Sequence, residues 1–183
     1  MIQTARLDLV IAREMQLRAE LESRDALAAS LGCDVPSSWP PEFYDEDAVR
    51  YSLDWLRDHP SEAEWGFYYF LERAAAGERR TLVGAGGFKG PPDADGLVEL
   101  GYSIVPERRR RGYATEATRA MLAFAFASPR VQTVMGQTLP SLVGSIGVLE
   151  KAGFEFVGAG ADPHAPPGEQ VIRYAITRER WQL

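Results

Sequence analysis

The chain has 183 residues, of which 45% are hydrophobic and 10% aromatic, and its formal net charge is −6. This length and apolar content suffice for one folded domain, residues 1–183, and leave little room for a second core. The acidic balance argues against a nucleic-acid-binding protein, and the single cysteine excludes an intramolecular disulfide. The N-terminus lacks a secretory pattern, and the longest apolar run, residues 121–127, is too short to cross a bilayer. We therefore expect a cytoplasmic protein without a membrane partner.

Hydrophobic periodicity, glycines and prolines divide the chain into alternating elements. In chain order they are a strand at 7–11, helices at 14–31 and 45–58, strands at 65–71, 82–88 and 97–105, a helix from 115, a strand at 131–139, a helix at 141–152, and strands at 154–158 and 170–176. Gly32, Pro60 and Gly153 mark helix ends, and three prolines make 35–41 a loop. The glycine-rich run 84–90 matches no nucleotide-binding pattern and is interpreted as the end of a strand.

The junction between the strand at 97–105 and the following helix carries the strongest functional signal. Four arginines, Arg108 to Arg111, precede Gly112, and Ala114 keeps the first helical turn small. The first amides of a helix lack internal partners and lie at the positive end of its dipole, so a phosphate is stabilised there. A solvated basic turn or a nucleic-acid patch would show the same arginines. One local basic spot in an acidic chain favours a compact polyphosphate.

Residues 109–114 read Arg-x-x-Gly-x-Ala, which resembles the acyl-CoA pyrophosphate loop of the GCN5-related N-acetyltransferases (GNAT). The strand 98–104, the loop and helix start 112–117, and the segment 145–154 are similar to the branch that acetylates the N-termini of ribosomal proteins, the RimJ/RimL-like branch. The resemblance implies an α/β domain with a mostly antiparallel, splayed sheet of about seven strands and helices on both faces. It assigns acceptor-site helices and a loop to residues 1–90, and the acetyl-CoA-binding core to residues 97–160.

The same resemblance implies the ligands and their contacts. The expected cofactor is acetyl-CoA, the expected partner is an amine acceptor, and a homodimer stays open. The residues expected to bind the cofactor are Ile104, Val105, Arg109, Arg110, Arg111, Gly112, Tyr113, Ala114 and Thr115. No metal site is expected, because the two histidines, His59 and His164, lie far apart in the sequence.

Two positions depart from the family pattern. Many members carry a tyrosine that protonates the departing thiolate, and Leu149 stands in its place. In the branch that this chain resembles, a serine has that role, and Ser145 matches it; a plain hydroxyl in the first helical turn is the alternative. The family's asparagine is replaced by Leu142. These departures leave open a second function, that of a catalytically idle acyl-CoA-binding sensor.

Glu99 is the candidate base. An acceptor amine is mostly protonated at pH 7, since α-amino groups titrate near about 8 and lysine near about 10.4, so a carboxylate must take a proton directly or through one water. Glu99 interrupts an apolar strand, where a charge without a role is costly, although a solvated Glu is the alternative. Strand alternation groups Glu99 with Gly101 and Ser103, opposite Tyr102. A backbone N–H near Ile104 or Val105 could stabilise the attacked carbonyl.

Three aromatic residues are candidates for acceptor binding. Trp39 and Tyr44 lie in the proline-rich region between the early helices, where they wall the acceptor site or belong to the core, and Tyr102 lies on the central strand. His164 is interpreted as a solvated loop residue, with acceptor contact as the alternative. The acceptor itself stays open among a protein N-terminus, a polyamine, an aminoglycoside and an amino acid.

Overall fold

One continuous mixed sheet organises the chain in the computed structural model, which describes residues 1–75, 77–161 and 170–182. In these residues the sheet has eight strands in the order β1-β2-β3-β4-β5-β6-β8-β7. Their bounds are Ile2–Gln3 (β1), Leu7–Ile11 (β2), Phe67–Glu72 (β3), Thr81–Phe88 (β4), Leu97–Ile104 (β5), Thr133–Thr138 (β6), Glu155–Gly160 (β7) and Val171–Thr177 (β8). Neighbouring strands are antiparallel except for the parallel pair β5–β6. The predicted mostly antiparallel sheet is therefore confirmed, with the short β1 added to the predicted strands.

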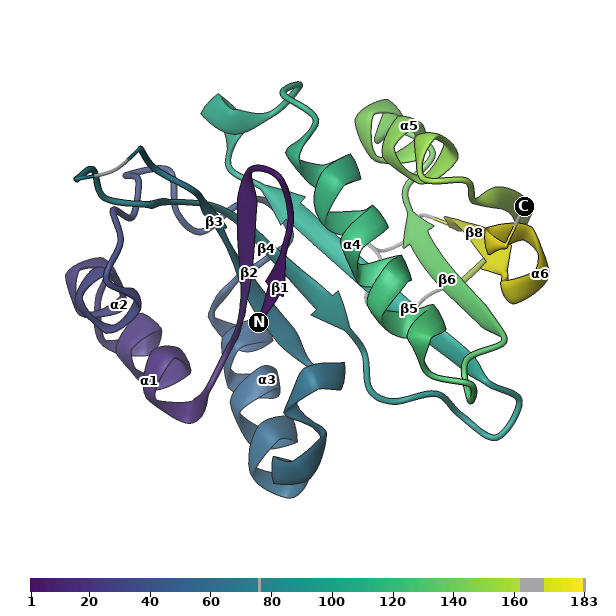
Figure 1. The fold of residues 1–183 in the computed structure, drawn as a ribbon, viewed down its shortest axis with the longest axis horizontal. Helices are drawn as coiled ribbons and strands as arrows, with labels where there is room; N and C mark the ends of the chain where they lie inside the picture. Colours follow the sequence, from purple (N-terminus) through teal and green to yellow (C-terminus); the bar gives the residue numbers. More distant parts are fainter. Residues whose placement is uncertain (76, 162–169, 183) are drawn as a thin grey trace.

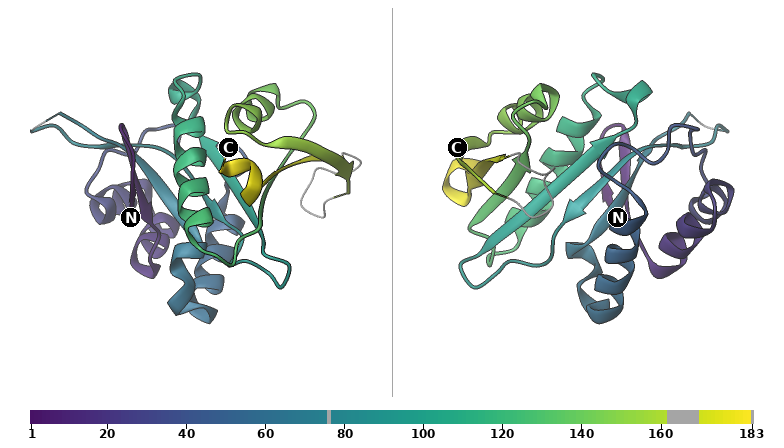
Figure 2. Two further views of the ribbon diagram at one scale, coloured as in Figure 1. Left: turned by 45° about the vertical axis from the view of Figure 1, so that its right-hand side comes forward. Right: turned by 180° about the vertical axis from the view of Figure 1, so that it is seen from behind.

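Helices cover both faces of the sheet, as predicted. Their bounds are Glu14–Glu22 (α1), Arg24–Leu31 (α2), Glu46–Asp58 (α3), Tyr113–Ala127 (α4), Val143–Lys151 (α5) and Arg178–Trp181 (α6), with 3-10 turns at Pro60–Trp65 (η1) and Pro106–Arg108 (η2). Figure 1 shows α4 lying along one face, and the view from behind in Figure 2 shows α1, α2 and α3 on the other. Two core clusters follow this division, one under α4 and α5 and one under α1 to α3.

The predicted helix over 14–31 is wrong in one respect, because Ser23 divides it. Ser23 has extended backbone angles (φ −170°, ψ 162°), and its side chain accepts a hydrogen bond from the Ala26 N–H at 3.0 Å. A serine side chain satisfies a free helical amide better as an N-cap than inside a helix. The chain therefore turns at Ser23, and α2 begins in a new direction.

Other boundaries move by a few residues. The strand expected from Trp65 begins at Phe67, because Trp65 closes the η1 turn and packs in the core against Phe88. The glycine-rich run lies in and just after β4, as interpreted from the sequence. Within the described residues, no helix is both long and apolar enough to span a bilayer.

The sheet opens at its centre, between its two parallel strands. Pairing of β5 with β6 ends at Leu100 and Gly136, whereas pairing of β5 with β4 continues to Ile104. The two strands diverge beyond that point, with α5 beside the end of β6 (Figure 1). This splay places the last four residues of β5 at a gap in the sheet, which agrees with the predicted splayed sheet.

Candidate active site

The N-terminus of α4 presents free backbone donors next to this gap. The first intrahelical bond runs from the Glu116 N–H to the Gly112 carbonyl at 3.0 Å, so the N–H groups of Tyr113, Ala114 and Thr115 precede it, and no side chain caps the helix. Gly112 has φ +84°, and a Cβ placed on it would meet only the Arg6 guanidinium, at 3.3 Å. An anion can therefore approach these amides, and the turn fits the pyrophosphate of an acyl-CoA.

The four arginines before Gly112 divide into two pairs. Arg108 forms an ion pair with Glu72 at 2.7 Å. Arg109 binds the Ile104 carbonyl at 3.0 Å and the Glu42 carboxylate at 2.9 Å, so its side chain braces the loop. Arg110 and Arg111 are exposed and enter no ion pair among the described residues. Their charges face solvent and can meet phosphate oxygens.

Tyr113 contributes its backbone rather than its side chain at this turn. Its ring is buried, its hydroxyl donates to Glu72, and the Arg6 guanidinium lies 4.6 Å from the ring centre. Sequence reasoning missed Arg6, which also donates to the Arg111 carbonyl at 2.9 Å and to Glu116. No local motif marks Arg6, because its partners lie more than a hundred residues further along the chain.

The gap beside β5 contains backbone donors. The N–H of Val105 donates to the Val83 carbonyl at 3.0 Å and is not free, so Val105 cannot supply the expected donor. Residues of an antiparallel strand turn their backbone groups alternately to the two sides. Val105, Ser103 and Gly101 therefore face β4, while Ile104 and Tyr102 turn their N–H groups into the gap. Ile104 is the position that fits a carbonyl contact there.

Glu99 shares a face of β5 with Gly101 and Ser103, as the alternation predicted, and this is the face that α1 to α3 cover. Its side chain is 19% exposed and forms an ion pair with Lys89. The Gln137 amide also donates to it at 2.9 Å, and Arg173 donates to the oxygen of that amide at 3.1 Å. These bonds orient the amide and hold the carboxylate at the border of the gap.

Open space adjoins Glu99 on the same face. Gly101 is exposed, and a Cβ placed on it would meet no atom within 4 Å. Beyond it, the Ser103 hydroxyl donates to the Glu42 carbonyl at 2.8 Å, which fixes the loop before α3 against β5. The surface over Gly101 is therefore bordered by Glu99 on one side and by this loop on the other.

Tyr102 and Ser145 meet on the opposite face. The Tyr102 hydroxyl donates to the Ser145 carbonyl at 3.1 Å and lies 3.4 Å from Ser145 Oγ. Burial raises the pKa of Tyr102 to about 12, although the contact with Ser145 lowers it. The Tyr102 side chain therefore lies on the opposite face of the sheet from Trp39 and Tyr44, the other two predicted acceptor residues. Leu149 is buried and fills the space over Gly136, so a tyrosine at 149 would have to displace core atoms.

Trp39 and Tyr44, the other two predicted acceptor residues, lie together but are mostly buried. Their polar atoms donate to Glu20 of α1, at 2.7 Å from Trp39 Nε1 and 2.8 Å from the Tyr44 hydroxyl. Sequence reasoning missed Glu20, because one glutamate on an exposed-looking helix carries no motif. The alternative predictions for the pair, wall and core, are both compatible with this arrangement. His164 lies outside the described residues.

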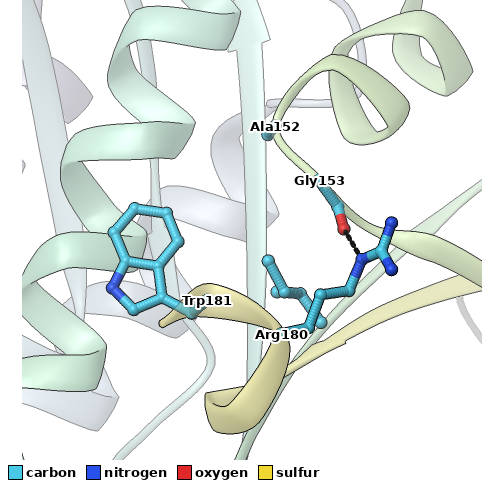
Figure 3. A pocket seen from close by; sticks show the side chains of 5 residues that line it. Ala152, Gly153, Arg180 and Trp181 are labelled. Atoms are coloured by element: carbon cyan, nitrogen blue, oxygen red, sulfur yellow. Dashed lines mark hydrogen bonds between the residues drawn. The ribbon is translucent and has the colours of Figure 1, made fainter. Parts of the chain in front are cut away.

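A shallow pocket elsewhere contains none of these residues. It is lined by Ala152, Gly153, Ile176, Arg180 and Trp181 (Figure 3). Arg180 crosses it and donates to the Gly153 carbonyl at 2.9 Å. The pocket joins α6 to the end of α5 and lacks the free donors and the carboxylate described above, so we do not assign the chemistry to it.

Comparisons with known proteins find similarity to acetyltransferases. The model of a family described as acetyltransferase (GNAT) domain matches residues 17–155. The chain is 25% identical over 154 residues to the uncharacterized N-acetyltransferase YjdG of Bacillus subtilis, covering 84% of this chain and 89% of that protein. A GNAT-family acetyltransferase structure from Bacillus anthracis superposes with a TM-score of 0.66 at 22% identity, covering 97% and 98% of the two chains. The ribosomal L7/L12 alpha-N-protein acetyltransferase RimL, solved with coenzyme A, gives 0.64 at 15% identity, covering 95% of each.

The chain therefore belongs to the GNAT family and is an acetyl-CoA-dependent N-acetyltransferase. The family resemblance drawn from residues 98–154 is confirmed, and so is the acetyl-CoA cofactor.

Proposed function

We propose that this chain transfers the acetyl group of acetyl-CoA to a primary amine by direct attack in a ternary complex. The observation that carries the proposal is the splay. Backbone donors for the cofactor lie at the start of α4 and on the side of β5 that borders the gap. Glu99 borders the same gap, on the face of the sheet opposite to α4. The cofactor supplies an acetyl thioester, whose carbonyl an amine can attack. Residues 97–160 would hold the cofactor, and residues 1–90 would shape the acceptor side.

The cysteine content favours direct attack over an acetylated enzyme. Cys33 is the single cysteine, it is completely buried, and burial raises its pKa to about 11. A thiol in this state is a poor nucleophile, because the thiolate is the reactive form. The amine would therefore meet the thioester itself.

Groups that border the gap would perform the three catalytic steps. Glu99 would take the ammonium proton, directly or through one water, before the nitrogen–carbon bond forms. The Ile104 N–H would stabilise the negative charge on the carbonyl oxygen. As the carbon–sulfur bond breaks, Ser145 or water would give a proton to the sulfur.

The test is thiol release from acetyl-CoA against a panel of amines and peptides, with Glu99→Gln as the key variant. We expect Glu99→Gln to lower kcat by about 100-fold, while coenzyme A affinity measured by calorimetry stays within about twofold, as is typical for lost acid–base assistance. Glu150→Gln, an exposed change on α5, is the matched control and should be neutral. A Glu99→Gln enzyme with the wild-type rate from pH 6 to 9 would remove Glu99 from the mechanism.

The alternative, an idle acyl-CoA-binding sensor, uses the same cofactor site and rests on the replacements at Leu142 and Leu149. It predicts tight coenzyme A binding and no thiol release with any amine of the panel. One amine that is acetylated with saturation kinetics decides for the enzyme.

A further inference from the structure

Glu20 is a half-buried carboxylate that the proposed reaction does not use. Three aromatic side chains donate to it: Trp39 Nε1 at 2.7 Å, the Tyr44 hydroxyl at 2.8 Å and the Tyr69 hydroxyl at 2.6 Å. Each of these groups has one proton and points it at Glu20, so the carboxyl serves as acceptor in all three bonds, which is the role of its ionised form. Burial raises its pKa, and the three bonds oppose that rise.

This charge lacks a compensating cation. Among the described residues, Glu20 enters no ion pair, although ten other acidic residues do. An ionised carboxylate taken out of water without a counter-charge is costly, and hydrogen bonds offset only part of that cost. The cluster therefore keeps a negative potential that an incoming cation can satisfy.

The rings around Glu20 add to this potential. Trp39, Tyr44, Phe67 and Tyr69 form a closed chain of aromatic contacts, with centroids 4.8 to 6.1 Å apart. The polar atoms of Trp39, Tyr44 and Tyr69 face Glu20, and the ring of Phe67 is half-buried. The face of an aromatic ring attracts a cation. A carboxylate and aromatic faces together are the chemistry that binds an alkylammonium group.

The strand register places this cluster beside the open surface over Gly101. Tyr69 pairs with Ala85 and Ala85 with Ser103, while Phe67 pairs with Gly87 and Gly87 with Gly101. Neighbouring strands lie about 4.8 Å apart, so two strand steps separate the cluster from Gly101 by about 10 Å. A diamine whose first nitrogen reacts at the gap could therefore extend its second nitrogen toward the cluster.

We propose that Glu20 is the charge determinant of the acceptor site, and that the preferred acceptor is an amine that carries a second positive charge. The inference rests on the proposed acetyl transfer. Trp39 and Tyr44 form its wall, and Glu20 both orients them and supplies the attraction. The amine that reacts after it loses its proton and the ammonium group that is recognised lie at opposite ends of the acceptor.

The test compares a linear diamine with the monoamine of the same chain length as acceptors. We expect wild-type kcat/KM to be higher for the diamine. Glu20→Gln should reduce the diamine value about tenfold more than the monoamine value, with coenzyme A affinity unchanged, because it removes one charge and keeps the shape. Glu14→Gln, an exposed change on the same helix, is the matched control and should leave the diamine-to-monoamine ratio of kcat/KM unchanged.

Tyr44→Phe provides a second variant, since it removes one donor to Glu20 and keeps the ring. It should also lower the diamine-to-monoamine ratio of kcat/KM, by a smaller factor than Glu20→Gln. This variant tests the proposal even if Glu20→Gln does not fold. Equal losses for both acceptors in these variants, or no wild-type preference for the diamine, would overturn the charge assignment. If the monoamine and the diamine are acetylated equally well, the charge assignment is wrong but the proposed acetyl transfer stands. If no amine gives thiol release, the proposed function itself is contradicted.

Discussion

The proposed cofactor side and the proposed acceptor side of this molecule are built in different ways. On the cofactor side, the donors are backbone amides from one short stretch of chain, those of Ile104 and of Tyr113 to Thr115. Arg110 and Arg111 lie between them and enter no ion pair among the described residues. On the acceptor side, the polar groups are side chains from separate elements, Glu20 on α1, Tyr69 on β3 and Glu99 on β5. The first kind of site depends on local backbone shape, so it is sensitive chiefly to side chains that would cover the amides. The second depends on long-range packing and can be altered residue by residue.

The largest effect is expected where a side chain would cover the backbone donors. Gly112→Val should weaken coenzyme A binding by more than about 100-fold, because φ +84° is strained for valine and the side chain stands over the anion's approach. Gly32→Val is the matched control, since Gly32 also has positive φ (+61°) with no atom near its Cβ position, but lies on the acceptor side. Both variants should lose stability in thermal unfolding, and only the first should lose coenzyme A affinity by calorimetry. Unchanged affinity in a folded Gly112→Val protein would break the comparison.

A smaller effect is expected on the acceptor side, where acceptor turnover should fall and coenzyme A affinity should not. Gly101→Val adds a side chain whose Cβ would have no atom within 4 Å, so the fold should be retained while the surface over Gly101 is filled. We expect acceptor kcat/KM to fall roughly 30-fold and coenzyme A affinity to stay constant. Gly101→Ala should cause a graded, smaller loss. If coenzyme A affinity falls with acceptor activity, the two sides are not separable at β5.

The smallest effect concerns the proton returned to sulfur. Ser145→Ala should slow turnover on the order of tenfold or less, since a thiol with a pKa of about 8.5 leaves readily near neutral pH and water can substitute. Because burial raises the pKa of Tyr102 to about 12, its hydroxyl stays protonated up to about pH 11, and kcat should show no alkaline decline from this residue below that value. A pH–rate profile of wild type, Ser145→Ala and Tyr102→Phe checks both points. Full activity of Ser145→Ala would make Ser145 structural.

The sequence predicted the turn before α4 better than the cluster around Glu20 for a physical reason. Strand, glycine turn and helix start are contiguous, so periodicity and turn residues define the backbone donors. Glu99 and Gly101 were also placed on one face by simple alternation, and the structure agrees. By contrast, the bonds from Trp39, Tyr44 and Tyr69 to Glu20 join segments up to 49 residues apart, and no local pattern encodes them.

Two differences from expectation have local causes. Ser23 ends α1 because its hydroxyl caps α2, a competition that apolar spacing does not register. Val105 cannot donate into the gap because strand pairing with Val83 uses its N–H, and only the register reveals which residues of β5 face which neighbour. Both differences arise where hydrogen bonding, rather than hydrophobic pattern, decides the backbone.

The most direct measurement is the crystal structure of the protein with acetyl-CoA. We expect the pyrophosphate on the N–H groups of Tyr113, Ala114 and Thr115, and the thioester in the gap with its carbonyl oxygen at the Ile104 N–H. We also expect Glu99 across the gap from the thioester, with open space for an amine over Gly101. Density for the cofactor at another surface, or a thioester directed away from β5, would contradict the proposed site.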